Sequence, residues 1–189
     1  NETLEWLLAV GSGRSLACGA SAANTPTRKA TEFRDYDRTA WYAEAVGAAV
    51  DNGLLYGKSA TVIDPNGDMT RAEMAAIINR SFGCYKTADI SQYKDVAKSK
   101  WYYKDVALAV QMGTYNGRSA SAMAPDAPIS RQEAMTVVAR ALELDYDAYA
   151  KTDLSAFPDR SEITNWALPY VRAMVGADYI HGKTQGPDT

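Results

Sequence analysis

The segment Met69-Thr70-Arg71-Ala72-Glu73-Met74, preceded by Asp64-Pro65-Asn66-Gly67, determines how the chain folds. Thr70 is a preferred N-cap residue, and Glu73 stands where its side chain can accept a hydrogen bond from the Thr70 amide, which is the reciprocal capping box. Apolar residues then recur at helical spacing until Gly83. This pattern predicts an amphipathic helix. Because a cation in the first turn is mildly unfavourable with the helix dipole, Arg71 suggests a functional role.

The same pattern recurs 60 residues downstream, where Ser130-Arg131-Gln132-Glu133 matches Thr70-Arg71-Ala72-Glu73. Trp41 and Trp101 are also 60 residues apart, and Trp166 follows 65 residues after Trp101. A register kept over unlike intervening residues indicates duplication. We therefore divide the chain into an N-terminal short helix and linker (1–32), a first repeat (33–86), a second repeat (87–146) and a partial third repeat (147–189).

Each repeat opens with an aromatic-x-Asp step and a tryptophan-led helical segment. Thr39, Ser99 and Thr164 stand two residues before their tryptophans and are predicted N-caps. Sixteen residues after each tryptophan is a glycine followed by a basic residue: Gly57-Lys58, Gly117-Arg118 and Gly182-Lys183. Gly53, Gly113 and Asp178 are expected to end the three helices in the left-handed conformation.

Composition limits the classes of function. The chain has 189 residues, 47% of them hydrophobic, and a formal net charge of -3. This balance argues against general nucleic-acid binding, which needs a basic surface. No apolar run approaches the ~20 residues of a transmembrane helix, so no membrane insertion is expected. Cys18, Cys84 and the single His181 lack metal-ligand spacing, so neither a metal nor a cofactor is predicted, and pairing of the two cysteines is left open.

Catalysis is not predicted. No serine or cysteine nucleophile has a histidine partner, because His181 lies in a divergent turn. Most paired carboxylates have a structural explanation, although a glycoside hydrolase with two facing acids is not excluded by sequence.

The combination of an aromatic-x-Asp start, a tryptophan-led helix, a glycine turn, a Pro-Asn or Pro-Asp loop and a Thr-Arg-Ala-Glu helix resembles the S-layer homology motif. The likeness covers about residues 33–189, with two complete motifs and the first half of a third. The resemblance implies an all-α, mainly helical domain with long loops, in which three motifs form a pseudo-threefold, three-pronged arrangement. It also implies an extracellular domain of a larger surface protein, anchored non-covalently to a secondary cell-wall polysaccharide that carries pyruvylated amino sugars.

In that family the sugar lies in grooves between motifs, and the arginine of the Thr-Arg-Ala-Glu element is a principal ligand. The chemistry agrees, because a pyruvate ketal presents a fixed carboxylate that a guanidinium pairs with bidentately. Free amide groups at a helix N-terminus also suit an anion. The predicted ligand-binding residues are Arg71, Arg131, Gly57, Gly117, Gly182, Lys58, Arg118 and Lys183.

Other roles are open for several of these residues. Trp41, Trp101 and Trp166 are expected to be core anchors rather than ligands, and Thr70, Glu73, Ser130 and Glu133 to be capping residues. The two arginines can instead pair with nearby acids, and the basic turn residues can serve solubility alone. Glu5-Trp6-Leu7-Leu8 can form a helix that fills the position left by the incomplete third repeat. A protein-interaction scaffold and a cell-wall glycan hydrolase are the rival functions.

Overall fold

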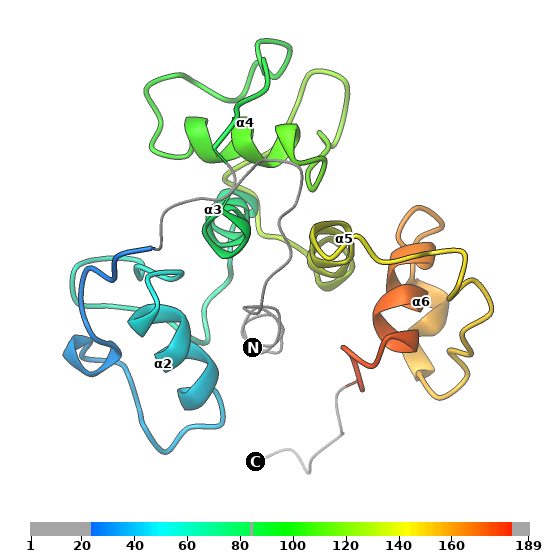
Figure 1. Ribbon diagram of the computed structural model, residues 1–189, viewed down its shortest axis with the longest axis horizontal. Helices are drawn as coiled ribbons and strands as arrows, with labels where there is room; N and C mark the ends of the chain where they lie inside the picture. Colours follow the sequence, from blue (N-terminus) through cyan, green and yellow to red (C-terminus); the bar gives the residue numbers. More distant parts are fainter. Residues whose placement is uncertain (1–23, 84, 183–189) are drawn as a thin grey trace. The chain divides into compact units, whose positions relative to one another are not determined.

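The computed structural model describes residues 24–83 and 85–182, and Figure 1 shows that these residues form helices joined by long loops. The α-helices are α2 (Ala43–Asp51), α3 (Arg71–Phe82), α4 (Tyr103–Gln111), α5 (Arg131–Ala141) and α6 (Leu168–Gly176), with short 3-10 helices at Ala30–Glu32 and Pro158–Glu162. No strand occurs in this part of the chain; one isolated bridge pairs Thr70 with Pro128. The predicted helical fold class is therefore confirmed.

The chain divides into two compact units, one within Asn1–Ile129 and the other within Ser130–Thr189. In the first unit α3 packs against α4, and in the second α5 packs against α6. The division falls inside the second sequence repeat, immediately before the capped helix that the repeat contains.

Both capping boxes form as the sequence predicts. In α3 the Glu73 amide donates to Thr70 Oγ1 at 3.2 Å, and the Thr70 amide donates to Glu73 Oε2 at 2.8 Å. Ser130 and Glu133 repeat the pair at 3.3 and 2.9 Å at the start of α5. Gly83 ends α3 in the left-handed conformation with φ 68°. Each box satisfies two of the amide groups that a helix N-terminus leaves without intrahelical partners.

The apolar stripe of α3 is buried within the first unit. Met74, Ile77 and Ile78 are at most 1% exposed. Full burial of side chains of this size contributes about 1.5–3 kcal/mol each relative to exposure. The buried stripe fixes the rotation of the helix about its axis, and with it the directions of Glu73 and Arg80 on the other faces.

The expectation that the tryptophans are core anchors is wrong. Trp41, Trp101 and Trp166 are 63%, 60% and 51% exposed, whereas the residue after each is buried: Tyr42, Tyr102 and Ala167. The helices begin later than the pattern suggested, at Ala43, Tyr103 and Leu168. The residue that follows each tryptophan therefore lies on the apolar stripe of its helix, together with the residues four and eight positions after it. The tryptophan itself lies outside this stripe.

The predicted N-caps of these helices are wrong for the same reason. The N-cap positions of α2, α4 and α6 are Tyr42, Tyr102 and Ala167, and no side chain caps the helix there. Thr39 instead donates its hydroxyl to Asp37 Oδ1 at 2.7 Å, and Thr164 donates to Gln132 Oε1 at 2.9 Å. Each helix begins two residues after its tryptophan, so the turn before it is longer than predicted. Ser99 lies in this turn before α4.

The predicted left-handed helix ends are confirmed. Gly53, Gly113 and Asp178 have φ angles of 69°, 74° and 64°. Pro169 lies in the first turn of α6, where its missing amide hydrogen costs nothing.

The aspartates of the aromatic-x-Asp steps hold the loops that carry the glycines. Asp35 accepts hydrogen bonds from the amides of Ile63 and Asp64, and Asp95 accepts from Met123 and Ala124. Burial by itself would raise the pKa of Asp35, but the bonds from these amides outweigh it, so the pKa is lowered. These contacts connect residues that are 28 and 29 positions apart along the chain.

In the second unit a cluster of aromatic rings and one guanidinium joins α5 to α6. Arg140 lies over the ring of Tyr170 at 4.8 Å and donates to its hydroxyl at 3.0 Å. Tyr146 meets the same ring edge-on at 4.8 Å. Tyr146, in the segment between α5 and α6, therefore packs against the second of the two helices that the segment joins.

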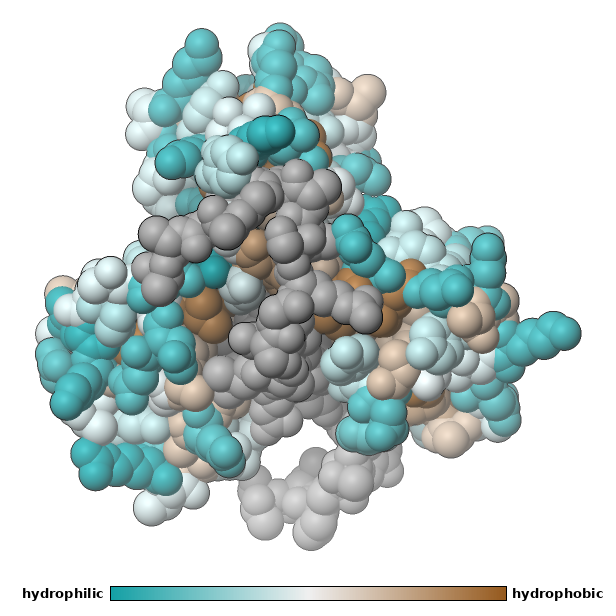
Figure 2. All heavy atoms as spheres, viewed as in Figure 1, coloured by the Kyte–Doolittle hydropathy of each residue, from teal (hydrophilic) through white to brown (hydrophobic). Residues whose placement is uncertain are grey.

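Several predictions fall outside the described residues: the N-terminal helix with its Glu5-Trp6-Leu7-Leu8 segment, Cys18, Cys84 and Lys183. Among the described helices, none is both long enough and apolar enough to cross a membrane. Figure 2 shows predominantly hydrophilic side chains on the visible outer surface around α4, with hydrophobic residues visible only in places.

Candidate functional site

Arg71 joins the start of α3 to the loop of the second repeat at residues 115–129, here called the second-repeat loop. The side chain is 5% exposed. Its Nε donates to the Met123 carbonyl at 3.0 Å, and Nη2 donates to the Asn116 carbonyl at 3.1 Å. The guanidinium also lies over the Tyr115 ring at 5.2 Å. The planar guanidinium holds its five donors in a fixed fork, so it can donate to both carbonyls while it lies against the ring.

The amide groups at the start of α3 are also engaged, so the expectation of free amide hydrogens at this helix terminus is wrong. The Arg71 amide donates to the Ala127 carbonyl at 3.0 Å, and the Ala72 amide donates to the Pro125 carbonyl at 2.9 Å. Glu73 donates its amide to its own cap, Thr70. The sequence could not reveal this, because the acceptors lie more than 50 residues away along the chain.

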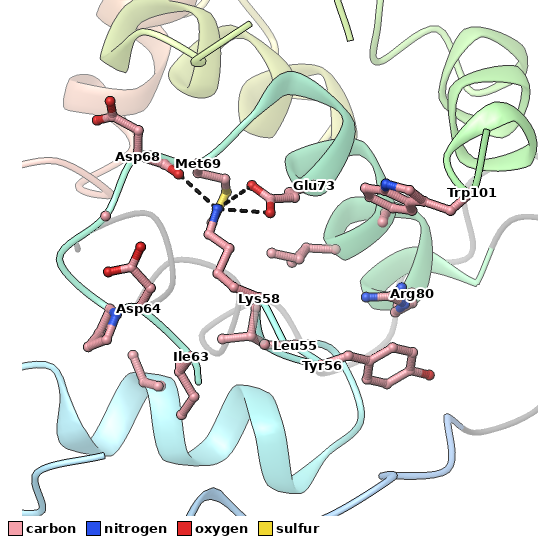
Figure 3. Close-up of a pocket in the computed structure, with 16 residues that line it drawn as sticks. Leu55, Tyr56, Lys58, Ile63, Asp64, Asp68, Met69, Glu73, Arg80 and Trp101 are labelled. Carbon is pink, nitrogen blue, oxygen red and sulfur yellow. Dashed lines mark hydrogen bonds and ion pairs between the residues drawn. The ribbon is translucent and has the colours of Figure 1, made fainter. Parts of the chain in front are cut away.

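A cavity of about 320 Å³ lies between α3 and the corresponding loop of the first repeat, residues 55–69, here called the first-repeat loop. Its lining includes the predicted ligand residues Gly57 and Lys58, together with Glu73 and Arg80 of α3 and Trp101. Figure 3 shows the side chains of Lys58, Glu73, Arg80 and Trp101 around the cavity. A volume of this size is at the lower end of the range for small-molecule sites.

Lys58 is already paired within this cavity. Its Nζ lies 2.6 Å from Glu73 Oε2 and 2.8 Å from Oε1, and donates to the Asp68 carbonyl at 2.8 Å. Glu73 therefore has two roles, as the acceptor of the capping box and as the counter-ion of Lys58. The Lys58 and Glu73 side chains remain 31% and 25% exposed, so water still screens the pair.

Arg80 is the cavity residue that the sequence analysis missed. It lies in the last turn of α3, its guanidinium is 3.9 Å from the centroid of the Tyr56 ring, and Nη1 donates to the Leu54 carbonyl at 3.0 Å. Among the described residues no carboxylate forms an ion pair with it. The sequence repeat could have revealed Arg80, because Arg140 occupies the equivalent position 60 residues later, in α5.

The aromatic groups of the cavity lie at the Arg80 end. Figure 3 shows Arg80, Tyr56 and Trp101 on one side of Lys58, and Asp64 and Asp68 on the other. Trp101 meets Tyr102 edge-on at 5.4 Å, which orients its exposed ring without burying it. The cavity therefore has an end with a guanidinium and an open indole, and an end rich in carboxylates.

The glycines of the loops have a packing role. A β-carbon on Gly57, which has φ 83°, would lie 2.7 Å from both the Phe33 ring and the Val62 carbonyl. At Gly117 it would overlap Tyr93, and at Gly182 it would lie 2.7 Å from Phe157. The aromatic residue that opens each repeat therefore packs on the glycine of the same repeat. This contact explains why a glycine is needed at all three positions.

The other predicted ligand residues lie in different places. Arg118 is exposed, and its Nη2 donates to the Pro128 carbonyl at 3.2 Å, the counterpart of the Lys58 contact with Asp68. Arg131 is exposed at the start of α5, in the second unit. Gly182 is the last described residue. The structure thus brings Gly57 and Lys58 together in one cavity, while Arg71 lies against the second-repeat loop.

No cluster of three or more histidine, cysteine, aspartate or glutamate side chains suited to a metal ion occurs in residues 24–83 and 85–182. Burial and the hydrogen bond to Asp126 raise the pKa of Tyr102 to about 12. The Tyr102 hydroxyl therefore keeps its proton at neutral pH and donates it in the hydrogen bond to Asp126. A group with such a high pKa is a weak candidate for catalytic proton transfer.

Comparison with known proteins now adds to this geometry. The sequence model of the S-layer homology domain matches residues 32–75 and 92–135. The chain is 32% identical over 164 residues to the surface-layer 125 kDa protein of Lysinibacillus sphaericus, which covers 86% of this chain and 14% of that protein. It is 26% identical over 138 residues to the cellulosome-anchoring protein of Acetivibrio thermocellus, covering 68% of this chain and 30% of that protein.

Some relatives carry the names of enzymes. An endoglucanase of Bacillus sp. is 26% identical over 188 residues, which cover 98% of this chain but 20% of that protein. The chain thus spans a small part of the relatives that it matches. The domain model matches the greater part of both complete repeats, from the aromatic-x-Asp step through the loop to the first turn of the capped helix. The chain therefore contains tandem S-layer homology motifs, and its surface-layer and anchoring relatives support a role in cell-surface anchoring.

Proposed function

We propose that the chain anchors a larger surface protein by binding an acidic sugar of a cell-wall polysaccharide, such as a pyruvylated amino sugar, in the first-repeat cavity. Its location is extracellular, at the cell wall, as the tandem motifs and the surface-layer relatives indicate. The observation that carries the proposal is Arg80, a guanidinium held by Tyr56 and Leu54 at the wall of a cavity and without an ion-pairing carboxylate among the described residues.

The chemistry of the Arg80 end fits a ketal carboxylate. The contact with Tyr56 and the bond to Leu54 reduce the rotamer entropy that an arginine loses on binding, so the guanidinium is preorganised. Trp101 offers an exposed aromatic face for the apolar side of a sugar ring. Lys58 adds a second cation, although a ligand carboxylate must compete with Glu73 for it.

The roles of the other predicted ligands follow from where they lie. We assign Arg71 to holding the second-repeat loop, which carries Gly117 and Arg118, so its effect on binding is through position rather than contact. Arg118, Arg131, Lys183 and Gly182 are proposed as counterparts in the other motifs. The enzyme names of some relatives describe proteins that extend far beyond the matched region, and the proposed role of this chain is binding without catalysis.

A sedimentation assay with purified cell walls tests the proposal. Wild type should sediment with the walls and be released by a competing pyruvylated saccharide, whereas Arg80→Ala should remain largely in the supernatant. Lys104→Ala, which removes an exposed lysine of α4 outside the cavity, is the matched control. Sedimentation that the saccharide does not reduce would favour the rival role as a protein-interaction scaffold. Release of soluble sugar by the chain alone would favour a glycan hydrolase.

A further inference from the structure

Three asparagines of the first unit are each followed by glycine, at Asn52-Gly53, Asn66-Gly67 and Asn116-Gly117. This pair loses the side-chain amide of asparagine readily, because glycine has no side chain to hinder attack by its own backbone nitrogen. All three asparagines are exposed. Sequence and exposure therefore do not separate the three pairs, but their hydrogen bonds do.

The reaction requires the peptide group that joins the two residues to turn. The glycine nitrogen loses its proton and attacks Cγ of the asparagine; a C–N bond forms, and the side-chain nitrogen leaves as ammonia after taking up a proton from water. Water then opens the cyclic imide at one of its two carbonyls, which leaves an aspartate or an isoaspartate. Water is the only co-reactant. Hydrogen bonds to the joining peptide or to the carboxamide oppose the reaction, because they must break before the ring can close.

At Asn116-Gly117 the joining peptide is held on both sides. The Asn116 carbonyl accepts a hydrogen bond from Arg71 Nη2 at 3.1 Å. The Gly117 amide donates to the Tyr93 hydroxyl at 3.2 Å. These two groups belong to the same peptide, so turning it would break both bonds. This pair is therefore protected in the folded chain.

At Asn52-Gly53 the reacting carboxamide itself is held. Asn52 Nδ2 donates to the Ala48 carbonyl at 2.8 Å. The Gly53 amide, which would supply the attacking nitrogen, donates to the Val50 carbonyl at 2.9 Å. Both reacting groups are thus engaged at the end of α2, and this pair is protected as well.

Asn66-Gly67 is the least restrained of the three pairs. Within residues 24–83 and 85–182, neither the side chain nor the carbonyl of Asn66 forms a hydrogen bond. The Gly67 amide donates only to the Asp64 carbonyl, at 3.1 Å across a turn. A β-carbon at position 67 would overlap the Asp64 carboxylate, so the turn favours the residue that makes the pair reactive. We propose that Asn66 is a site of spontaneous deamidation in the folded protein, and that its conversion weakens binding of an acidic ligand in the first-repeat cavity.

The conversion places a carboxylate beside that cavity. Pro65 and Gly67, the two neighbours of Asn66, both line it. Figure 3 shows Asp64 and Asp68 at the same end. Either product makes this end more negative, and isoaspartate also adds a methylene to the main chain of the turn. The effect on sugar binding rests on the proposed function, whereas the chemical reaction does not depend on it.

Peptide mapping by mass spectrometry on the full chain tests the modification site. The protein is incubated at mildly alkaline pH, where the amide nitrogen loses its proton more readily, both folded and in guanidinium chloride. In the folded chain Asn66 should convert within about three-fold of its denatured rate, whereas Asn52 and Asn116 should convert at least roughly ten-fold more slowly than theirs. Equal protection of all three asparagines, or faster conversion of Asn52 or Asn116 than of Asn66, would overturn the inference.

Two variants make the test specific. Asn66→Gln keeps a carboxamide but would have to close a larger ring, so position 66 should stay unmodified. Tyr93→Phe removes the hydroxyl that accepts from the Gly117 amide, and should speed conversion of Asn116 roughly three- to ten-fold without changing the rate at Asn66. An unchanged rate at Asn116 would show that these hydrogen bonds do not decide which pair reacts.

Titration of aged protein with a pyruvylated amino sugar tests the consequence. Aged wild type should bind roughly two- to five-fold more weakly than fresh wild type, because the added charge is partly screened by water. Aged Asn66→Gln should bind like its fresh form. Full conversion of Asn66 without a change in affinity would overturn the consequence for binding. If fresh wild type does not bind the sugar, the proposed function fails, while the peptide map still decides the modification site.

Discussion

Arg71 and Asp95 hold Met123 from its two backbone sides. The Arg71 Nε donates to the Met123 carbonyl at 3.0 Å, while the Met123 amide donates to Asp95 Oδ1 at 2.9 Å. Burial works to raise the pKa of Asp95, but the bonds from Met123 and Ala124 and the charge of Arg71 outweigh it, and the pKa is lowered. One arginine thus connects the first capped helix to the loop that bears the next glycine-basic pair.

Loss of this arginine should destabilise the first unit. Arg71→Ala leaves the carbonyls of buried Met123 and of Asn116 without their guanidinium donor. We expect a loss of about 2–3 kcal/mol in the free energy of unfolding, measured by urea denaturation. Arg71→Lys should recover only part of it, because one ammonium cannot reach both carbonyls. Arg118→Ala, at an exposed site, is the control. An Arg71→Ala protein as stable as wild type would show that the contact is not structural.

The glycine turns give a matched pair of substitutions. Gly57→Ala and Gly113→Ala both place a side chain at positive φ, but a β-carbon at Gly57 meets Phe33 and Val62, whereas at Gly113 nothing lies within 4 Å. Gly113→Ala should cost about 1–2 kcal/mol for the backbone conformation alone, and Gly57→Ala about 1–3 kcal/mol more for the overlap. The difference between the thermal unfolding midpoints of the two variants measures the cost of the overlap with Phe33 and Val62. Equal midpoints would show that this overlap costs nothing.

Acid should weaken the loops through Asp35 and Asp95. Their pKa values are lowered in the folded chain, so each contributes stability that is full above the unfolded pKa and is lost as the pH falls through the folded value. We expect the loss between about pH 5 and pH 2. The double variant with Asp35→Asn and Asp95→Asn should be less stable than wild type at pH 7 and show a flatter decline in this range. A decline as steep as that of wild type would assign the acid sensitivity to other groups.

Exposure of the tryptophans predicts unequal effects of neighbouring substitutions. Trp101→Ala should change the free energy of unfolding by less than about 1 kcal/mol, because the ring is 60% exposed. Tyr102→Ala should cost about 3–5 kcal/mol, because its ring is 1% exposed and its hydroxyl donates to Asp126 at 2.8 Å. Denaturation of the two variants side by side checks this; a larger loss for Trp101→Ala would restore the core role that the sequence suggested.

The parts that the sequence predicted correctly depend on contacts within a few residues. The capping boxes at Thr70 and Ser130 and the left-handed ends at Gly53, Gly113 and Asp178 follow from local backbone chemistry, and the repeat follows from spacing. The tryptophans were misassigned because a hydrophobic residue near a helix start fits two neighbouring registers, and one residue decides which side chain is buried.

The site was less predictable because it depends on pairings across the chain. Sequence placed Arg71 at a helix terminus correctly, but its acceptors lie 45 and 52 residues away, and nothing local distinguishes a bound arginine from a free one. Lys58 follows Gly57 in the sequence, but its pairing with Glu73 was not foreseen. Arg80 was overlooked because a basic residue in the last turn of a helix is common for dipole reasons alone.

Calorimetric titration with a synthetic pyruvylated amino sugar, and with the same sugar lacking the pyruvate, tests the binding account most directly. We predict that wild type binds the pyruvylated form more tightly, that Arg80→Ala loses roughly ten- to a hundred-fold in affinity for it, and that Lys104→Ala behaves as wild type. Equal affinity of wild type and Arg80→Ala for the pyruvylated sugar, or no preference of wild type for it over the unmodified sugar, would contradict the account.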